Sequence, residues 1–217
     1  LLELYETFEL SRLLADLKKG GDTSSSTNTA DAKKSTASSE PTAEDDDVVN
    51  NADAIEAQYD TILDKALFTT WLNKLKACEQ FSFDTETTSV NYMKAELVGL
   101  SFAIEVGKAA YVPLTHDYEE APEQLDRDWV LEQLKPLLES TIIKKIGQNL
   151  KYDANVLSHY DIALQGVGFD TMIESYCFNS VATRHNMDAL ALKYLGYKTI
   201  YFEEVAGKGV KQLTFNQ

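Results

Sequence analysis

The sequence has 217 residues, of which 44% are hydrophobic and 10% aromatic, so it can bury the core of at least one domain. Its formal net charge of −15 at pH 7 argues against a surface that coats nucleic acid through unspecific positive charge. The sequence contains no run of 18 apolar residues, so we expect no transmembrane helix and no membrane partner.

Two N-terminal stretches differ in kind from the rest of the chain. Residues 1–19 have the apolar spacing of a short helix, which Gly20 and Gly21 would end. Residues 20–57 are rich in Ser, Thr, Ala, Asp and Glu and contain no aromatic residue. Such a composition cannot bury enough apolar area to offset the entropy lost on ordering. We therefore predict a disordered acidic linker over 20–57, with an acidic interaction tail as the alternative.

From about residue 58 the pattern becomes that of a globular domain. It predicts helices at 66–77, about 127–139, 150–160, 170–180 and 187–195, and strands at 80–86, 97–105, 108–114 and 142–146. Asp126 is a candidate N-cap, and Pro136 should kink its helix or end it early. Three hairpin-like strands followed by mixed strands and helices predict an α/β domain with a mixed sheet.

The two cysteines, Cys78 and Cys177, fit neither a metal-binding spacing nor a disulfide framework. Both stand among apolar residues, so we expect two buried, reduced thiols. Reduced thiols are typical of a cytoplasmic protein, which is the location we expect.

The first candidate site follows an apolar strand. Asp84 and Glu86 are two residues apart, so their side chains point the same way from a strand. Two neighbouring carboxylates repel each other unless a cation lies between them, and oxygen-only ligands suit Mg²⁺ or Mn²⁺. The alternative is that both side chains are merely solvated where the strand ends.

The second candidate, Gly147 to Asp153, also follows a short apolar strand and opens a helix. Asn149 and Asp153 are four residues apart and would share a helix face. An ordinary cap by Asn149 with an acidic first turn explains the same residues without chemistry.

Two further segments carry polar residues near helix starts. Asp170 precedes a predicted helix, and capping accounts for it. Arg184 and His185 could contact phosphate or a nucleotide, or could belong to an exposed loop at a helix start. The sequence has no phosphate-binding glycine loop and no cysteine–histidine cluster.

Taken together and in order, these motifs resemble the 3′→5′ exonuclease domain of bacterial family A DNA polymerases, members of the DEDD superfamily. The resemblance covers roughly 58–217 and rests on runs that include Phe83–Thr87, Gly147–Asp153, Phe169–Met172, Arg184–Leu190 and Phe202–Gly209. Residues 1–19 are similar to the end of the 5′-nuclease region that precedes this domain in the family.

The resemblance implies a ribonuclease H-like fold and proofreading hydrolysis of the 3′-terminal phosphodiester of DNA during replication and repair. It implies two Mg²⁺ or Mn²⁺ ions held by Asp84, Glu86 and Asp153 as catalytic residues. It also implies a pocket for the last nucleotide, lined by Thr87, Val90, Gln148, Asn149 and Tyr152, to which we add Arg184 and His185 as candidate substrate contacts. The expected partners are a single-stranded or frayed DNA 3′ end and the polymerase and 5′-nuclease domains of one parent chain.

One motif of the family is missing from the sequence. The resemblance implies a third motif, Tyr-x-x-x-Asp, but no tyrosine after Asp153 has an aspartate four residues on. We therefore expect an incomplete exonuclease domain over 58–217 that is nearly inactive by itself. The alternatives are a non-catalytic spacer domain of the polymerase and a ribonuclease D-like exonuclease that acts on RNA.

Overall fold

The computed structural model describes residues 57–181, 183–209 and 212–217. The helix predicted over 1–19, and the predicted linker apart from its last residue, lie outside the described residues. None of the helices within the described ranges has the length and apolar character needed to cross a membrane.

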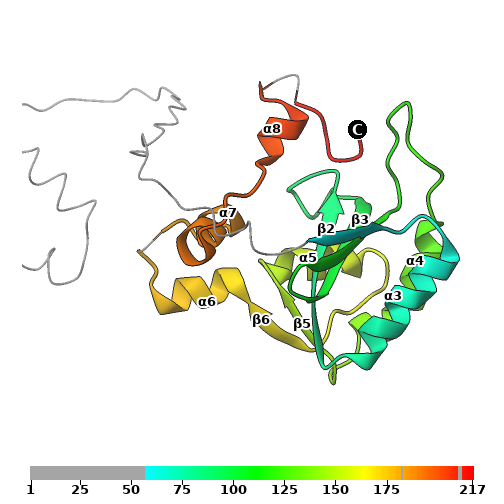
Figure 1. Cartoon of the computed structure of the whole chain (residues 1–217), viewed down its shortest axis with the longest axis horizontal. Helices are drawn as coiled ribbons and strands as arrows, with labels where there is room; N and C mark the ends of the chain where they lie inside the picture. The colour runs from blue at the N-terminus through cyan, green and yellow to red at the C-terminus, as the bar shows by residue number, and fades with distance from the viewer. Residues whose placement is uncertain (1–56, 182, 210–211) are drawn as a thin grey trace, which may run out of the picture. The chain divides into compact units, whose positions relative to one another are not determined.

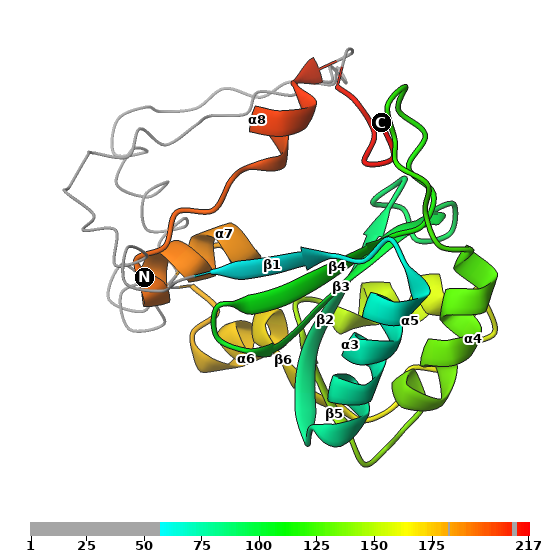
Figure 2. The same ribbon diagram turned by 45° about the vertical axis from the view of Figure 1, so that its right-hand side comes forward.

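The domain is built on a mixed six-stranded sheet with the order β1-β4-β3-β2-β5-β6. Figures 1 and 2 show this sheet in two views, and Figure 2 labels all of its strands. The strands are β1 (Gln58–Thr61), β2 (Gln80–Thr87), β3 (Leu97–Glu105), β4 (Lys108–Pro113), β5 (Lys144–Gly147) and β6 (Val167–Asp170). β2, β3 and β4 pair antiparallel, as predicted, whereas β1, β5 and β6 each pair parallel with their neighbours. The predicted α/β class is confirmed. β1 and β6 were not predicted, because each is a four-residue edge strand too short to show an alternating pattern.

The helices agree with the predicted positions within a few residues. They are α3 (Lys65–Ala77), α4 (Arg127–Leu138), α5 (Leu150–Ser158), α6 (Thr171–Phe178), α7 (Met187–Leu190), the π-helical turn η2 (Ala191–Leu195) and α8 (Phe202–Ala206). The helix predicted over 187–195 is thus divided into an α-helical and a π-helical turn, and Gly196 ends it in the left-handed region as expected. α8 has five residues and was not predicted.

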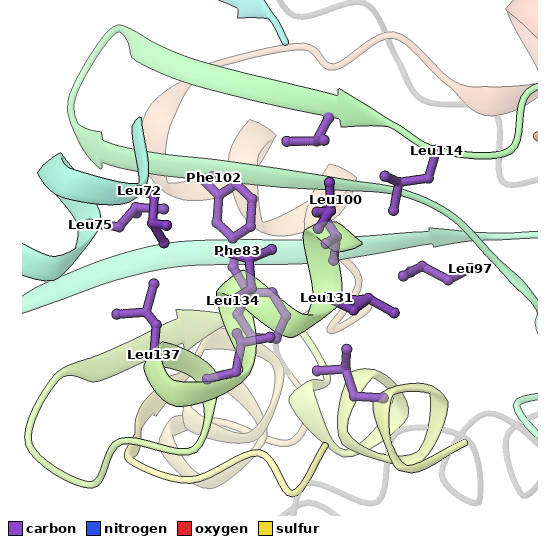
Figure 3. Close-up of a cluster of buried hydrophobic side chains, with 14 of the residues drawn as sticks. Leu72, Leu75, Phe83, Leu97, Leu100, Phe102, Leu114, Leu131, Leu134 and Leu137 are labelled. Atoms are coloured by element: carbon purple, nitrogen blue, oxygen red, sulfur yellow. The ribbon is translucent and has the colours of Figure 1, made fainter. Parts of the chain in front are cut away.

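The core lies between one face of the sheet and the helices α3, α4 and α5. Figure 2 shows α3 and α4 side by side against the sheet. In Figure 3 the leucines of α3 and α4 meet Phe83, Leu100 and Phe102 of the central strands. Burying each of these side chains stabilises the fold by about 1.5–3 kcal/mol. This packing holds β2 and α5 in place relative to each other.

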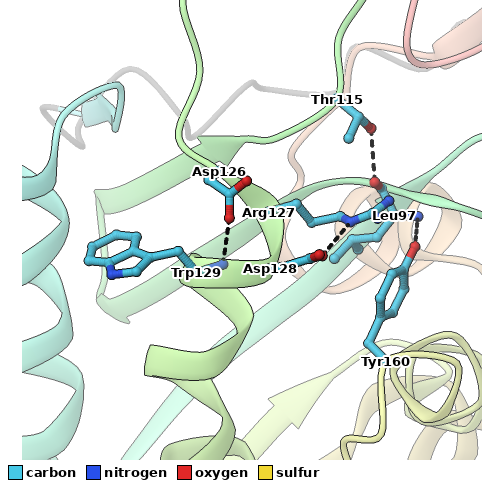
Figure 4. A network of polar contacts seen from close by, with 7 residues as sticks. All are labelled: Leu97, Thr115, Asp126, Arg127, Asp128, Trp129 and Tyr160. Atoms are coloured by element: carbon cyan, nitrogen blue, oxygen red, sulfur yellow. Dashed lines mark hydrogen bonds and ion pairs between the residues drawn. The ribbon is translucent and has the colours of Figure 1, made fainter.

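Local hydrogen bonds explain where two of these elements start. Asp126 accepts a bond from the Trp129 amide at 2.8 Å and so caps α4, as predicted (Figure 4). At the start of β3, the Leu97 amide donates to the Tyr160 hydroxyl, and the Leu97 carbonyl accepts from the Thr115 hydroxyl, each at 2.9 Å. Pro136 lies inside α4, and the helix runs past it to Leu138, so the proline does not end the helix at its own position.

The prediction that both cysteines are buried is wrong for Cys177. Both cysteines are free, and burial raises the pKa of the partly buried Cys78 thiol. Cys177 lies on α6 and is exposed, as are its apolar neighbours Tyr176 and Phe178. An apolar sequence neighbourhood indicated burial here, but nothing in the described residues covers this side of α6.

Candidate functional site

The two carboxylates of β2 project from the face of the strand that faces away from the core. Along β2, buried side chains alternate with partly exposed ones. The buried ones are Phe81, Phe83 and Thr85, and the partly exposed ones include Asp84 and Glu86. This alternation is what a half-covered strand produces. The structure therefore places Asp84 and Glu86 on one side of β2, as the sequence predicts.

Asp153 reaches β2 from the first turns of α5. Its carboxylate is 1% exposed and accepts hydrogen bonds from the Thr85 amide at 3.0 Å and the Thr85 hydroxyl at 2.6 Å. The Thr85 amide is available because β5 pairs with β2 only along Gln80–Ser82. Two distant parts of the sequence thus meet, and Asp153 is bonded to the residue that separates Asp84 from Glu86.

Burial of Asp84, Glu86 and Asp153 makes their ionised forms energetically unfavourable. Desolvation, together with the charges of Asp84 and Asp153, raises the pKa of Glu86 to about 7. Desolvation also raises the pKa of Asp153 to about 7, although its hydrogen bonds to Thr85 act in the opposite direction. Burial likewise raises the pKa of Asp84. None of the ion pairs within the described ranges involves these three carboxylates.

The chemistry of this donor set fits a hard divalent cation. Carboxylate oxygens are the ligands that Mg²⁺ and Mn²⁺ prefer, and a cation would offset the repulsion that raises these pKa values. Over the described part of the chain, no three His, Cys, Asp or Glu side chains are already disposed as a complete metal-binding group. One oxygen of Asp153 accepts both hydrogen bonds from Thr85. The residues therefore match such an ion in type, and Asp153 would contribute its second oxygen or a bound water.

A hollow of about 510 Å³ opens beside the end of β2, and we call it the strand-end hollow. Its walls are formed by Thr85–Val90, Asn149, Tyr152, Phe202 and Gln212–Phe215. The Tyr152 hydroxyl lies 2.5 Å from the Thr87 hydroxyl and donates to the Ser89 carbonyl at 2.5 Å, which fixes one wall. The structure thus brings four predicted substrate contacts to one hollow: Thr87, Val90, Asn149 and Tyr152.

The other three predicted substrate contacts lie elsewhere. Gln148 lines a separate apolar groove beside α6 and donates to the His185 carbonyl at 2.7 Å. The His185 ring bonds the Ser175 hydroxyl at 2.9 Å. Arg184 is exposed and lines neither this groove nor the strand-end hollow. Gln148 and His185 are thus hydrogen-bonded beside α6, and neither lines the strand-end hollow.

A second hollow of about 700 Å³, the carboxylate hollow, contains Asp84 and Glu86 in its wall. It shares Glu86, Phe202 and Leu213–Phe215 with the strand-end hollow, so the C-terminal segment separates the two. That segment is held to the β4–α4 loop, where the Asp117 amide donates to the Asn216 carbonyl at 2.9 Å.

Sequence reasoning missed several residues of this second hollow. The rings of Phe202 and Phe215 are stacked with centroids 6.1 Å apart, and His116 lies 6.0 Å from Phe215. His116 also bonds the Tyr111 hydroxyl at 2.7 Å, and that hydroxyl packs over Gly99, where a Cβ would be 2.1 Å away. The available signal was the position of His116 just after a strand. A single histidine outside any ligand pattern does not indicate that the C-terminal segment, distant in sequence, packs against it.

Comparisons with known proteins assign the family. A family model described as 3′–5′ exonuclease matches residues 59–217. DNA polymerase I of Pseudomonas aeruginosa is 59% identical over 164 residues, or 75% of this chain, and that of Rhizobium leguminosarum is 38% identical over 175 residues, or 73% of this chain. The chain spans only 18% and 17% of the lengths of these curated relatives.

The fold is shared more widely than the sequence. A solved structure of Trypanosoma brucei RNase D in complex with RNA has a TM-score of 0.54 and 13% sequence identity, and the match covers 67% of this chain and 49% of that chain. At this identity the likeness concerns the fold alone, which is the ribonuclease H-like fold expected from the sequence. The family model and the polymerase relatives are more specific, and the chain belongs to the 3′–5′ exonuclease domain family of DNA polymerase I.

Proposed function

We propose that this domain hydrolyses the terminal phosphodiester at the 3′ end of DNA and releases a nucleoside monophosphate, as the proofreading part of a DNA polymerase I. The observation that supports this most directly is the contact between Asp153 and Thr85, which gathers three carboxylates from two elements at one strand end. A non-catalytic spacer domain has no need of three costly buried carboxylates.

Asp84, Glu86 and Asp153 would hold two divalent ions, Mg²⁺ or Mn²⁺. When bound, such ions stabilise charge on the attacking and leaving oxygens of a phosphodiester. Asp84 would contribute to both ions, Glu86 to the one nearer the attacking water, and Asp153 to the other. Burial raises the pKa of Glu86 to about 7, and a bound cation would favour its ionised form.

The strand-end hollow would receive the last nucleotide. Tyr152 and Thr87 form its hydrogen-bonded wall, whereas Val90 is 95% exposed at its rim and offers an apolar contact for a base. Asn149 supplies an amide that is not used as a helix cap. The 3′ end would enter unpaired, because a single strand can carry its last nucleotide into this hollow of about 510 Å³ beside the carboxylates.

In the parent protein that we propose, residues 1–19 end a 5′-nuclease domain, 20–57 link it to the exonuclease domain, and a polymerase domain follows. This arrangement is supported by the polymerase relatives, of which the chain matches a small part.

We expect a DNA polymerase I that carries this chain to remove nucleotides from DNA 3′ ends at least about tenfold faster when the last pair is mismatched, because unpairing it costs less free energy. The measurement is release of labelled nucleotide from matched and mismatched DNA primers, with RNA primers of equal sequence as competitors. Faster trimming of RNA than of DNA would favour a ribonuclease D-like enzyme, and equal rates on paired and mismatched DNA would contradict proofreading.

A further inference from the structure

Asp170 lies where β6 ends and α6 begins, and it is 7% exposed. Its carboxylate accepts hydrogen bonds from the amides of Met172 at 3.1 Å and Ile173 at 3.2 Å, which is the predicted N-cap of α6. The same carboxylate also accepts from the amides of Asn149 at 3.0 Å and Leu150 at 2.8 Å. One side chain thus binds four backbone amides that belong to the starts of two helices.

The helix α5 depends on this second function of Asp170 because it has no cap of its own. The sequence allowed Asn149 to act as the cap, and this is wrong: Asn149 makes no side-chain capping bond. Its backbone is in the left-handed region with φ of 63°, which few residues other than glycine and asparagine adopt. Asp170 stabilises this conformation by accepting a hydrogen bond from the Asn149 amide, and its negative charge is favoured at the start of a helix.

The positions of the site residues on α5 depend on the residue at which the helix starts. Asp153 stands three residues after Leu150, so a shift of the helix start moves its carboxylate relative to the Thr85 amide, which lies only 3.0 Å away. Tyr152 reaches Thr87 from the same turn. Because the Asn149 side chain is not used for capping, it stays in the wall of the strand-end hollow.

We propose that Asp170 is a positioning residue of the exonuclease site. It fixes the start of α5 so that Asp153 meets β2 between Asp84 and Glu86, and it holds Asn149 in the conformation that lines the strand-end hollow. The functional part of this inference rests on the proposed exonuclease activity.

The discriminating variant is Asp170→Ser. Serine caps a helix about as well as aspartate, so α6 keeps a cap, but a single hydroxyl cannot serve four amides in two helices. The matched control is Asp64→Ala, which removes a cap that binds the amides of Ala66 and Leu67 at the start of α3. Loss of a cap costs about 1 kcal/mol, so both variants are expected to be destabilised to a similar extent.

The first measurement is amide hydrogen exchange in the 217-residue chain, followed by NMR or mass spectrometry. In Asp170→Ser the Thr85 amide is expected to exchange at least about tenfold faster relative to the Phe83 amide of the same strand. In Asp64→Ala this ratio should stay unchanged. If Asp170→Ser does not fold, Asp170→Asn, which keeps one carbonyl acceptor, should show the same change to a smaller extent. Unchanged relative protection of Thr85 in both Asp170 variants would overturn the proposal.

The second measurement is the exonuclease rate of a full-length polymerase that carries this chain. Supporting groups behind metal ligands are typically worth tenfold to a hundredfold in activity, so Asp170→Ser should lose about that factor while Asp64→Ala loses none. Equal rates in the two variants would overturn the positioning function. An inactive wild-type enzyme would instead refute the proposed function, and the exchange ratio would still report on whether Asp170 positions Asp153.

Discussion

Replacing Asp84 by Asn in a full-length polymerase that carries this chain is expected to lower its 3′→5′ exonuclease rate by at least about a thousandfold. Metal ions contribute several kcal/mol of transition-state stabilisation to such hydrolyses, and each 1.4 kcal/mol corresponds to a factor of ten. The amide has nearly the same shape but carries no charge. Because burial makes the Asp84 charge costly, the variant should fold at least as well as the parent.

The measurement is single-turnover release of the terminal nucleotide, with polymerase activity assayed in parallel. Asp128→Asn is the matched control, because Asp128 is an exposed carboxylate that pairs with its neighbour Arg127. The control should keep the full exonuclease rate, and both variants should keep polymerase activity. An unchanged rate in Asp84→Asn would show that the carboxylates are not catalytic and would favour the spacer-domain interpretation.

The sequence predicts the central elements well because their patterns are local. The buried alternation of β2 and the Asp126 cap of α4 follow from neighbouring residues alone, so both could be predicted. The shared direction of Asp84 and Glu86 follows from the same alternation. The family resemblance joined Asp153 to these two carboxylates, and the structure gives the physical link between it and β2 through Thr85.

What could not be predicted depends on contacts between distant parts of the chain. Asp170 has the ordinary sequence signature of a cap, and only the pairing of β5 with β6 shows that it also reaches the start of α5. The left-handed backbone of Asn149 has no signal in the sequence, because asparagine at a helix start ordinarily indicates a side-chain cap. His116 and Phe215 come together only because the C-terminal segment returns to the β4–α4 loop.

The position of Gln148, Arg184 and His185 has a similar explanation. Their motifs match the family in order, but order along the chain does not determine which side of α6 a residue occupies. In the structure Gln148 donates to the His185 carbonyl, and Arg184 is exposed. Tyr152, by contrast, is one residue from Asp153 on the same helix and lines the strand-end hollow.

The second large effect that we expect is a steep pH dependence of metal binding by the 217-residue chain. The pKa values of Glu86 and Asp153 are both raised to about 7. Below pH 7 protons occupy these carboxylates and a cation must displace them, whereas above pH 8 both are ionised. With two groups titrating near pH 7, Mn²⁺ affinity should rise about hundredfold from pH 6 to pH 8 and then level off.

Isothermal titration of Mn²⁺ into the chain at pH 6, 7 and 8 therefore tests most directly whether the buried carboxylates share a divalent cation. We predict the hundredfold rise for the parent and for Asp128→Asn, and a rise of only about tenfold for Glu86→Gln, in which one titrating ligand is lost. Affinity that does not change with pH, or that is the same in Glu86→Gln as in the parent, would contradict a metal site formed by Asp84, Glu86 and Asp153.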